Sequence, residues 1–353
     1  MNIAIDITPM HSGHKMRGVG SYTRLLKEAL EKSKSNHTFC FFTRGEKLPG
    51  KIDLIHYPYF DPFFLTLPFM SSIPYVVTVH DLIPLTYPDK FSSGLRGELK
   101  WRIQKFFLQR ARRVITDSHA SQKDIATIAG IPNNKIEVIY LAPSPVFRPI
   151  RSKPILDSVR KRYTLPQQFV LFVGDVNWNK NIFGLLKAFA IVLRSEAFKH
   201  TRLVFVGKAF LDEQLPEIQR INAAISDLSI GDSVVKLGFV SDEDLAAVYS
   251  LASVYVQPSY AEGFGFPVSE AMACGCPVVL SDASSLSEIV GPAVRVNPND
   301  PSDIASGIEQ ILRSRDNHAL SKKGIAWVKN FSWEKVAQQT IAAYKRALRG
   351  DLQ

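Results

Sequence analysis

The sequence contains little cysteine. Its 353 residues include three cysteines, Cys40, Cys274 and Cys276. An odd and small number of cysteines in a chain of this length predicts free thiols in a reducing compartment rather than a disulfide framework. Cys274 and Cys276 form a C-x-C pair with no second group of Cys or His nearby, so we expect small buried residues there and no metal site.

Long apolar segments are also missing. No run reaches the roughly 18 residues that a membrane-spanning helix needs. The first ten residues, MNIAIDITPM, lack the basic region and the apolar stretch of a signal peptide. With 46% hydrophobic and 22% charged residues the composition is that of a globular protein. These features predict a cytoplasmic location.

The common dinucleotide and P-loop motifs are absent. RGVGSYTRLL, residues 17–26, places Gly18 and Gly20 before an expected helix near Ser21, but Thr23 stands where a third glycine belongs and no P-loop lysine follows. This departure argues against a nicotinamide oxidoreductase. The two glycines indicate either a turn that admits a phosphate or an acceptor at a helix start, or a plain tight turn.

Strands and helices alternate along the chain, and the expected strands are apolar on both faces. Such strands are typical of parallel sheets that helices cover on both sides. The sequence therefore predicts an α/β fold with doubly wound sheets. The expected strands have the sequences NIAIDIT, LIHYPY, YVVTVHD, RVITDS, FVLFVGD, RLVFVGK, SVVKLG, SVYVQPS, PVVLSD and AVRVNP. The expected helices are 22–32, 96–110, 120–129, 183–194, 213–226, 242–251, 301–313 and 333–348.

A proline-rich stretch interrupts this alternation. APSPVFRPIRSKP, residues 142–154, has four prolines in thirteen residues and no periodicity, which is typical of a linker. We therefore expect a first domain over residues 1–148, a linker over 149–165 and a second domain over 166–332. The amphipathic helix after Ser332, within residues 333–353, is expected to return to the first domain.

Positive charge is concentrated in the first half. Residues 1–150 hold 20 Lys and Arg against 12 Asp and Glu, whereas the remainder holds 23 against 21. The segment from Arg96 to Arg113 is especially basic and includes Trp101, so an anionic membrane surface is one predicted contact. The alternative is a helix with an aromatic core-facing side and a solvated basic side. No nucleic-acid recognition motif accompanies the segment, and we expect no nucleic-acid partner.

Two polar residues follow predicted strands at the end where α/β sheets bind ligands. His80 ends YVVTVHD, where a histidine acts as a hydrogen-bonding group or a base, or is satisfied by the backbone. Lys180 lies between the strand ending at Gly174 and a helix near Ile182. A lysine at such a junction neutralises a diphosphate, although any surface lysine would fit the same pattern.

The stretch SYAEGFGFPVSEAMACGCPVVLSD, residues 259–282, holds two carboxylates around a glycine-rich turn. Glu262 lies in the predicted loop, and Glu270 lies about one turn into a helix that starts near Pro267. Free N–H groups near Gly265 at the helix start favour an anion, and carboxylates accept hydrogen bonds from sugar hydroxyls. A nucleoside diphosphate sugar satisfies both demands.

This E-x7-E pattern resembles that of the retaining GT-B glycosyltransferases of the large "group 1" family, glycosyltransferase family four. RGVGSYTRLL, VVTVHDLIPL, RRVITDSHAS, VGDVNWNKN, LGFVSDEDLAAVYSLA and SSLSEIVGPAVRVNPNDP resemble further blocks of that family in its usual order. The resemblance covers nearly the whole chain. It implies two Rossmann-like domains with an inter-domain cleft, a terminal helix crossing back to the first domain, and donor binding by the second domain.

The resemblance also implies residue roles. Glu262 would contact donor-sugar hydroxyls and Glu270 the ribose, and Lys180 would bind the diphosphate. The other implied site residues are Gly18, Gly20, His80, Phe239, Val240, Gly263, Phe264, Gly265 and Phe266: His80 near the reacting centre, Phe239 and Val240 near the base, and the rest beside the diphosphate, sugar or acceptor. The chain departs from the family where a basic residue commonly precedes the lysine, since Asp175 and Asn179 stand there. Lys208 is one candidate for the missing charge.

The expected function is transfer of a hexose, with mannose from GDP-mannose favoured, from a nucleotide diphosphate sugar to a glycan or lipid-linked acceptor. The implied reaction retains anomeric configuration by front-face attack and uses no metal or other cofactor. A lipid-linked acceptor would bring the protein to the inner face of the membrane. The alternatives are a nucleotide-sugar epimerase of the same fold and a non-catalytic protein that binds sugar nucleotides.

Overall fold

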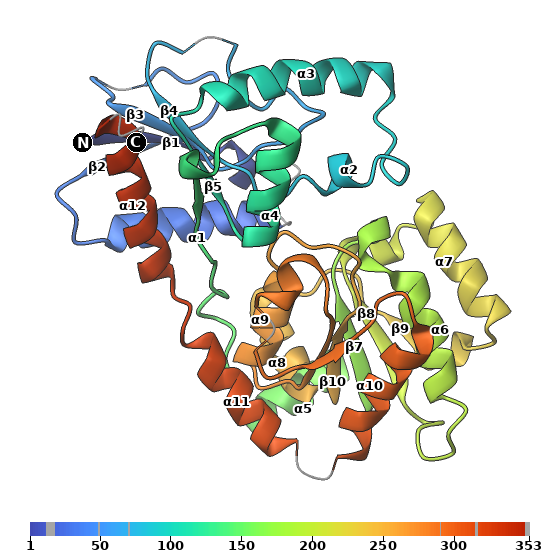
Figure 1. The fold of residues 1–353 in the computed structure, drawn as a ribbon. Coiled ribbons are helices and arrows are strands. Elements are labelled where there is room, and N and C mark those ends of the chain that lie inside the picture. The colour runs from blue at the N-terminus through green and yellow to red at the C-terminus, as the bar shows by residue number, and fades with distance from the viewer. Residues whose placement is uncertain (12–17, 49, 70, 290, 315–316, 350–353) are drawn as a thin grey trace. The chain divides into compact units, whose positions relative to one another are not determined.

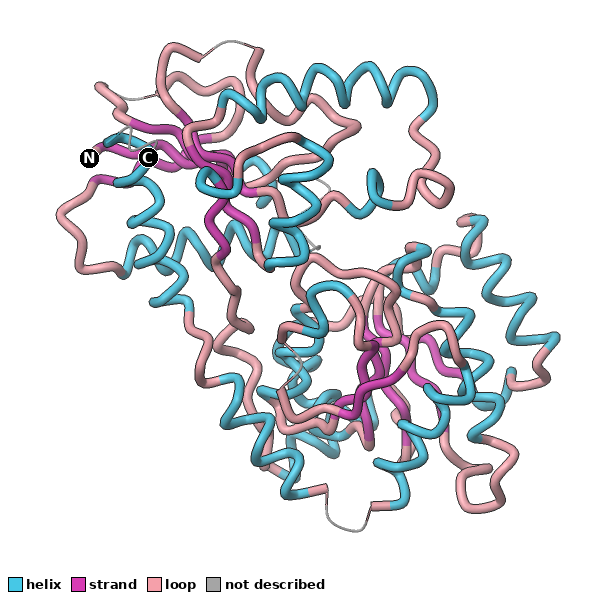
Figure 2. The backbone as a smooth tube through the Cα atoms, viewed as in Figure 1, coloured by secondary structure: helices cyan, strands magenta, loops and turns pink. Residues whose placement is uncertain are grey.

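The chain forms two compact α/β units, seen in a computed structural model that describes residues 1–353 except 12–17, 49, 70, 290, 315–316 and 350–353 (Figure 1). Unit 1 comprises Met1–Ala142 and Phe331–Gln353, and unit 2 comprises Pro143–Asn330. Each unit contains a six-stranded parallel sheet flanked by helices (Figure 2). The predicted fold class, an α/β fold with two doubly wound sheets, is confirmed.

The sheet of unit 1 has the order β2-β1-β3-β4-β5-β6. Its strands are β1 (Asn2–Asp6), β2 (Thr38–Phe42), β3 (Leu54–Tyr57), β4 (Tyr75–Thr78), β5 (Arg113–Thr116) and β6 (Ile136–Val138). The four inner strands are the apolar ones that the sequence predicts. Sequence analysis missed β2 and β6, the two edge strands, because β2 is largely half-exposed and β6 has three residues.

Unit 1 has five α-helices among its described residues. They are α1 (Gly18–Lys32), α2 (Ile83–Thr86), α3 (Gly94–Arg110), α4 (His119–Asp124) and α12 (Trp333–Arg349). Helix α1 begins at Gly18, three residues before the expected start, so Gly18 and Gly20 lie inside its first turn. Glycine is a poor helix former, which is why the pattern placed the start after both glycines. The expected helix 120–129 is split, since α4 ends at Asp124 and a π-helix covers Ile125–Ala129.

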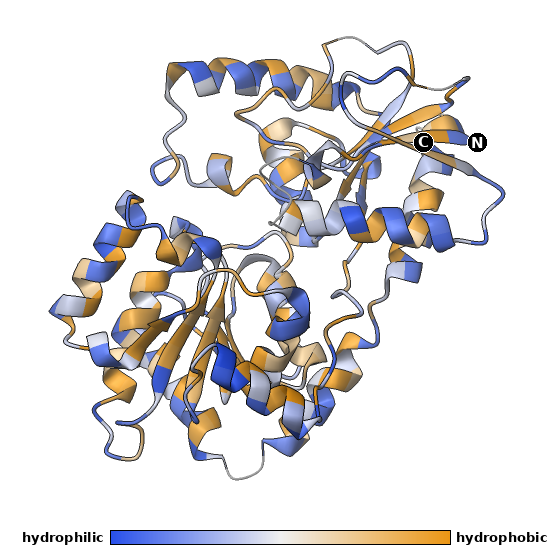
Figure 3. Ribbon diagram, turned by 180° about the vertical axis from the view of Figure 1, so that it is seen from behind, coloured by the Kyte–Doolittle hydropathy of each residue, from blue (hydrophilic) through white to orange (hydrophobic). Residues whose placement is uncertain are grey.

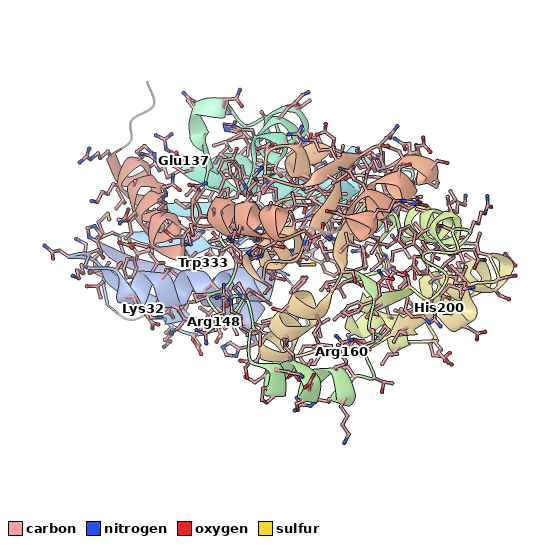
Figure 4. All side chains as sticks on the ribbon, turned by 90° about the horizontal axis from the view of Figure 1, so that it is seen from below. Lys32, Glu137, Arg148, Arg160, His200 and Trp333 are labelled. Carbon is pink, nitrogen blue, oxygen red and sulfur yellow. The ribbon has the colours of Figure 1, made fainter. Side chains whose placement is uncertain are left out.

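Helix α12 is held in unit 1 by a buried polar network, as the returning helix was expected to be. The Tyr344 hydroxyl lies 2.7 Å from His56 Nδ1, and His56 Nε2 lies 2.8 Å from Thr78 Oγ1. Burial lowers the pKa of His56 to about 3, so the imidazole is neutral. Nearer the end of the helix, Arg346 donates two hydrogen bonds to Glu137, which Figure 4 labels.

The sheet of unit 2 has the order β12-β11-β10-β7-β8-β9. Its strands are β7 (Phe169–Val173), β8 (Arg202–Val206), β9 (Val234–Lys236), β10 (Val254–Gln257), β11 (Val278–Ser281) and β12 (Val294–Val296). All six lie where the sequence predicts strands. From β7 the chain adds β8 and β9 toward one edge of the sheet, and then returns to add β10, β11 and β12 toward the other edge. The topological switch point therefore lies at the carboxyl ends of β7 and β10.

The helices of unit 2 include one in the expected linker. They are α5 (Lys153–Arg162), α6 (Ile182–Val192), α7 (Pro216–Asp227), α8 (Asp242–Leu251), α9 (Phe266–Ala273), α10 (Pro301–Arg313) and α11 (His318–Val328). Residues 149–165 are thus not a plain connector, because α5 contacts α8 and Arg162 pairs with Asp244 at 2.6 Å. Pro154 lies at the start of α5, where proline is tolerated, so the prolines misled the sequence analysis.

None of the described helices combines the length and the apolar character needed to cross a bilayer. The longest, α3 and α12, have 17 residues each, and both carry several charges.

The network around His56 yields a stability prediction. Tyr344→Phe removes the hydroxyl that pairs with a buried ring nitrogen of His56. The free energy of unfolding should fall by about 1–3 kcal/mol, the cost of an unsatisfied buried polar group. Urea unfolding at neutral pH measures the change. Tyr163→Phe serves as a control, since its hydroxyl bonds Asp244 near the surface and Asp244 keeps Arg162. Equal losses in both variants would contradict the assigned role of Tyr344.

Candidate functional site

The loops after β7 and β10 meet at the switch point of unit 2. Asn179, in the loop after β7, donates from Nδ2 to the carbonyl of Ala261 at 2.9 Å and accepts the N–H of Tyr260 at 2.8 Å. Asn181 donates to the carbonyls of Pro258 and Pro298 and also caps α6. These two asparagines fix the loops against each other. Sequence analysis did not single them out for this role, although their carboxamides flank Lys180 in the sequence.

Lys180 and Glu262 form an ion pair between these loops. Lys180 Nζ lies 2.9 Å from Oε1 and 2.8 Å from Oε2 of Glu262. The side chains are 17% and 8% exposed, so the pair is largely shielded from water. The two residues lie 82 positions apart in the chain, and the adjacency of β7 and β10 brings them together.

Further donors hold the Glu262 carboxylate. Gln257 donates from Nε2 to Oε1 at 2.7 Å, and Ser259 donates from Oγ to the same oxygen at 2.6 Å. Sequence analysis missed both residues. The available signal was their polarity within SVYVQPS, an otherwise apolar strand sequence, because a buried polar side chain needs a partner. With Lys180, the carboxylate accepts hydrogen bonds from three side chains.

Helix α9 begins at the glycine-rich turn, as predicted. Gly265 is its N-cap, with φ of +98°, and a Cβ there would lie 2.8 Å from Leu286 Cδ2. A glycine is therefore required both by the left-handed backbone and by the close packing. Ser285 donates to the carbonyl of Glu262 at 2.8 Å and fixes the start of the turn. The helix start remains a suitable place for an anion.

The aromatic residues of this turn differ in exposure. Phe264 is buried and Phe266 is half-buried, and their rings lie 5.7 Å apart in an edge-to-face arrangement. Gly263 is buried as well. Residues 263–265 can therefore meet a ligand mainly through their backbone, because the ring of Phe264 packs inward.

Glu270 lies one turn into α9 and is only partly exposed. Burial raises the pKa of its carboxyl to about 8; a hydrogen bond from the Tyr249 hydroxyl at 3.1 Å opposes this, and nearby Asp242 adds to it. Near neutral pH a large fraction of the carboxyl therefore carries a proton, so it both donates and accepts hydrogen bonds. Sequence analysis did not anticipate Tyr249, which lies on α8.

The loops after β8 and β9 adjoin this site. Gly207 donates its N–H to the carbonyl of Gly238 at 2.8 Å, and a Cβ on Gly207 would lie 2.1 Å from the carbonyl oxygen of Gly174. The loop that carries Lys208 is therefore seated directly on the loop that carries Asp175. The register of β7 and β8 pairs Val173 with Val206, so Asp175 and Lys208 each lie two residues beyond paired positions.

Phe239 and Val240, the predicted contacts of the nucleotide base, differ in exposure. Phe239 is 55% exposed, whereas Val240 is 4% exposed. The ring of Phe239 is thus available to a ligand. Val240 belongs to the core, and any ligand contact there would use its backbone.

An aromatic pair that sequence analysis missed lies beside Lys180. The rings of Trp178 and Tyr260 stack with centroids 4.8 Å apart and planes 21° apart. Both side chains are half-buried. Trp178 precedes Lys180 by two residues, and Tyr260 precedes Glu262 by two, so the stack joins the two loops that carry the ion pair.

His80, Gly18 and Gly20 belong to unit 1. His80 follows β4, and its Nδ1 lies 2.5 Å from Oδ2 of Asp117, which follows β5. Burial opposes the charged imidazole, but the charge and hydrogen bond of Asp117 dominate and raise the pKa of His80. The ring of Tyr22 lies 4.6 Å from that of His80, edge to face. Asp117 was not among the predicted site residues.

The elevated pKa of Glu270 yields a prediction on stability against pH. The unfolded carboxyl ionises near 4.5 and the folded one near 8. Unfolding therefore releases a proton between these values, and the contribution of Glu270 to the free energy of unfolding falls as pH rises from about 4.5 to about 8. Glu270→Gln removes this dependence and keeps an acceptor for Tyr249. We expect the free energy of unfolding of the variant to gain on the order of 3–4 kcal/mol relative to that of the parent between pH 5 and pH 8.

Urea unfolding across this pH range measures the difference. Glu196→Gln is the matched control, since the Glu196 side chain is 86% exposed. If Glu270→Gln and Glu196→Gln follow the same pH profile, the proposed protonation of Glu270 is wrong.

Comparison with known proteins shows which families the chain resembles. The chain matches the family "Glycosyl transferases group 1" over residues 159–330 and "Glycosyltransferase Family 4" over residues 36–142. It is 31% identical over 272 residues to the O-antigen chain mannosyltransferase B of Escherichia coli, covering 76% of this chain and 70% of that protein.

Solved structures share the fold. The sucrose-phosphate synthase of Thermosynechococcus elongatus superimposes with a TM-score of 0.75 over 98% of both chains, at 23% identity. HepE of Anabaena in complex with UDP-glucose superimposes with a TM-score of 0.73 over 98% of this chain and 99% of its own, at 19% identity. With the family matches and the mannosyltransferase relative, these likenesses show that the chain belongs to the group 1 (family four) glycosyltransferases and has the GT-B fold.

Proposed function

We propose that this glycosyltransferase transfers mannose from GDP-mannose to a glycan or lipid-linked acceptor with retention of anomeric configuration. The observation that carries the proposal is the Lys180–Glu262 ion pair beside the start of α9. A cation, a sugar-binding carboxylate and an anion-binding helix start are the groups that a nucleotide sugar needs. The mannosyltransferase name of the E. coli relative supports the sugar, and UDP-glucose in HepE supports a nucleotide-sugar donor.

In the proposed complex, each of these groups contacts one part of the donor. Its diphosphate would lie against the backbone at Gly263–Phe266 and Lys180, and its mannose hydroxyls would reach Glu262. The ribose would reach Glu270, which as a partly protonated acid can both donate to and accept from ribose hydroxyls. The exposed ring of Phe239 would lie against the base. Gly18 and Gly20 would lie next to the diphosphate or the acceptor.

Lys208 supplies the second cation for the diphosphate. Family members often have a basic residue shortly before Lys180, and Asp175 and Asn179 occupy those positions here. Lys208 is exposed and lies at the position equivalent to Asp175 on the neighbouring strand. The positive charge is thus moved from the loop after β7 to the loop after β8, which Gly207 seats against Gly174.

Transfer would proceed by front-face attack. The acceptor hydroxyl forms the new bond to the anomeric carbon as the bond to the diphosphate oxygen breaks, and the leaving oxygen takes the acceptor's proton. Lys180 and the start of α9 stabilise the charge that develops on the diphosphate. Glu262 is a poor candidate for a nucleophile, since three side chains donate hydrogen bonds to its carboxylate. His80, held by Asp117, would act near the reacting centre.

Lys180 and Glu262 are tested by single and paired variants. We expect Lys180→Ala and Glu262→Ala each to lower turnover by at least ~100-fold, the scale seen when one charge-stabilising donor is removed. Each single variant also leaves a buried charge unpaired, which destabilises the fold. Lys180→Met with Glu262→Gln avoids that charge and should fold normally yet remain inactive. Lys187→Ala, an exposed lysine of α6, is the control.

Near-normal turnover in either alanine variant would remove that residue from the mechanism. Recovery of activity in the paired variant would mean that the single losses are structural.

The stereochemical outcome is tested by proton NMR of the product. With GDP-mannose and an oligosaccharide acceptor, the new linkage should keep the α configuration of the donor. A β-linked product would contradict the retaining mechanism, and transfer from UDP-glucose but not GDP-mannose would contradict the donor. Incubation with the donor alone addresses the epimerase alternative, because conversion of the free nucleotide sugar without acceptor would support an epimerase.

A further inference from the structure

The outward face of α3 is apolar as well as basic. Leu95, Leu99 and Phe106 are 87%, 61% and 49% exposed, and their spacing of four and seven residues puts them on one side of the helix. The opposite side, with Gly97, Gln104 and Leu108, is buried in unit 1. Apolar residues therefore occupy both sides, and Figure 3 shows orange and blue alternating along the helix. The core does not account for the outer apolar residues.

The loop before β4 extends this apolar face. Phe64, Leu65 and Phe69 are 63%, 42% and 57% exposed. Lys100 of α3 places its Nζ 5.4 Å from the centre of the Phe64 ring, and the rings of Phe69 and Phe107 lie 5.8 Å apart. The loop and the helix thus form one continuous surface. We call it the α3 surface, with apolar residues Phe64, Leu65, Phe69, Leu95, Leu99 and Phe106.

A buried side chain fixes the loop to the helix. Gln104 Oε1 accepts the N–H groups of Thr66 at 2.9 Å and Leu67 at 3.0 Å, and also the Thr66 hydroxyl at 3.0 Å. Asp61 braces the same loop by accepting the N–H of Phe63 at 2.7 Å. The exposure of Phe64 and Leu65 is therefore a property of an anchored loop. A fold that holds six large apolar side chains in water at one place indicates a binding surface.

The charge on this surface is predominantly positive. Arg96, Arg102 and Arg110 are exposed on α3, and Arg110 lies 3.4 Å from the centre of the Phe106 ring. Lys100 adds a fourth cation, and Glu98 is the one acidic residue of the helix. A basic surface with exposed leucine and phenylalanine is the combination with which a protein binds the headgroup region of an anionic membrane.

We propose that the α3 surface docks on an anionic lipid bilayer, with Phe64, Leu95 and Leu99 entering the headgroup and acyl boundary and the arginines contacting lipid phosphates. A second copy of the chain fits less well, because two surfaces of the same charge would repel. Nucleic acid fits less well too, since Leu95 and Leu99, the most exposed aliphatic residues, have no partner on a phosphate backbone. Binding to lipid requires no sugar donor and is independent of the reaction proposed above.

The experiment is flotation of the purified full chain with vesicles of phosphatidylglycerol mixed with phosphatidylcholine, compared with phosphatidylcholine alone. We expect binding to the anionic vesicles only, and weaker binding at high salt because screening shortens the range of the attraction. Arg96→Glu with Arg102→Glu should weaken binding by at least ~25-fold, since each cation near such a surface contributes about fivefold. Leu95→Ser with Leu99→Ser should weaken it by at least ~10-fold.

Matched variants in other regions separate the surface from general effects. Ile155→Ser with Leu348→Ser removes two exposed apolar side chains elsewhere, and Lys161→Glu with Lys187→Glu reverses two exposed cations of unit 2. Both pairs should bind vesicles as the parent does. Equal binding to neutral vesicles, or equal losses in the matched variants, would overturn the proposal. Concentration-dependent dimers abolished by Leu95→Ser with Leu99→Ser, without vesicle binding, would assign the surface to self-association instead.

A thermal shift with GDP-mannose, measured on the same variants, distinguishes this proposal from the proposed function. Loss of vesicle binding with an unchanged shift supports the α3 surface as a separate site. Vesicle binding in a protein that shows no shift with any nucleotide sugar would leave the lipid proposal standing and count against the donor proposal.

Discussion

The Lys180–Glu262 ion pair is the interaction on which the candidate site in unit 2 depends. Two opposite charges with little water access persist only if the protein supplies further hydrogen bonds, and Gln257 and Ser259 supply them. The asparagines on either side of Lys180 then fix the loop after β7 to the loop after β10. A ligand with both an anionic group and hydroxyls can bind both partners, because its anion can contact Lys180 and its hydroxyls can contact Glu262.

The same arrangement accounts for the special residues around the pair. Gly265 is required where α9 begins, and Gly207 is required where the loop of Lys208 meets that of Gly174. Gly207 allows backbone to approach backbone closely, whereas at Gly265 the left-handed backbone and the neighbouring Leu286 side chain leave no room for a Cβ. The two glutamates have different surroundings. Burial raises the pKa of Glu270 to about 8. The Glu262 carboxylate accepts hydrogen bonds from a cationic lysine and from neutral donors.

Unit 1 shows the same dependence on contacts between distant residues. His80 becomes a group with a raised pKa only because Asp117 directly follows the neighbouring strand β5. His56, by contrast, is kept neutral by burial, with a tyrosine of α12 as its partner. Two histidines that look alike in the sequence therefore have opposite titration behaviour.

Much of the fold was predictable from local pattern. The inner strands of both sheets are apolar on both faces, and this pattern predicted them. The half-exposed edge strands of unit 2, β9 and β12, were also predicted, because both are rich in valine. The edge strands β2 and β6 and the helix α5 escaped detection, since half-exposed or proline-containing segments lack that signal. Of the site, Lys180, Glu262 and the turn at Gly265 were identifiable from residue type and position, whereas Gln257, Tyr249 and Asp117 were not.

By itself the sequence determined the class of fold, the strand-end positions of the polar residues and the family to which the chain belongs. Tertiary structure alone decided which of those residues meet. The order β12-β11-β10-β7-β8-β9 makes β7 and β10 neighbours, although their final residues, Val173 and Gln257, lie 84 positions apart in the sequence. Strand order depends on non-local packing, so no local pattern in the sequence records that Lys180 would lie within hydrogen-bonding distance of Glu262.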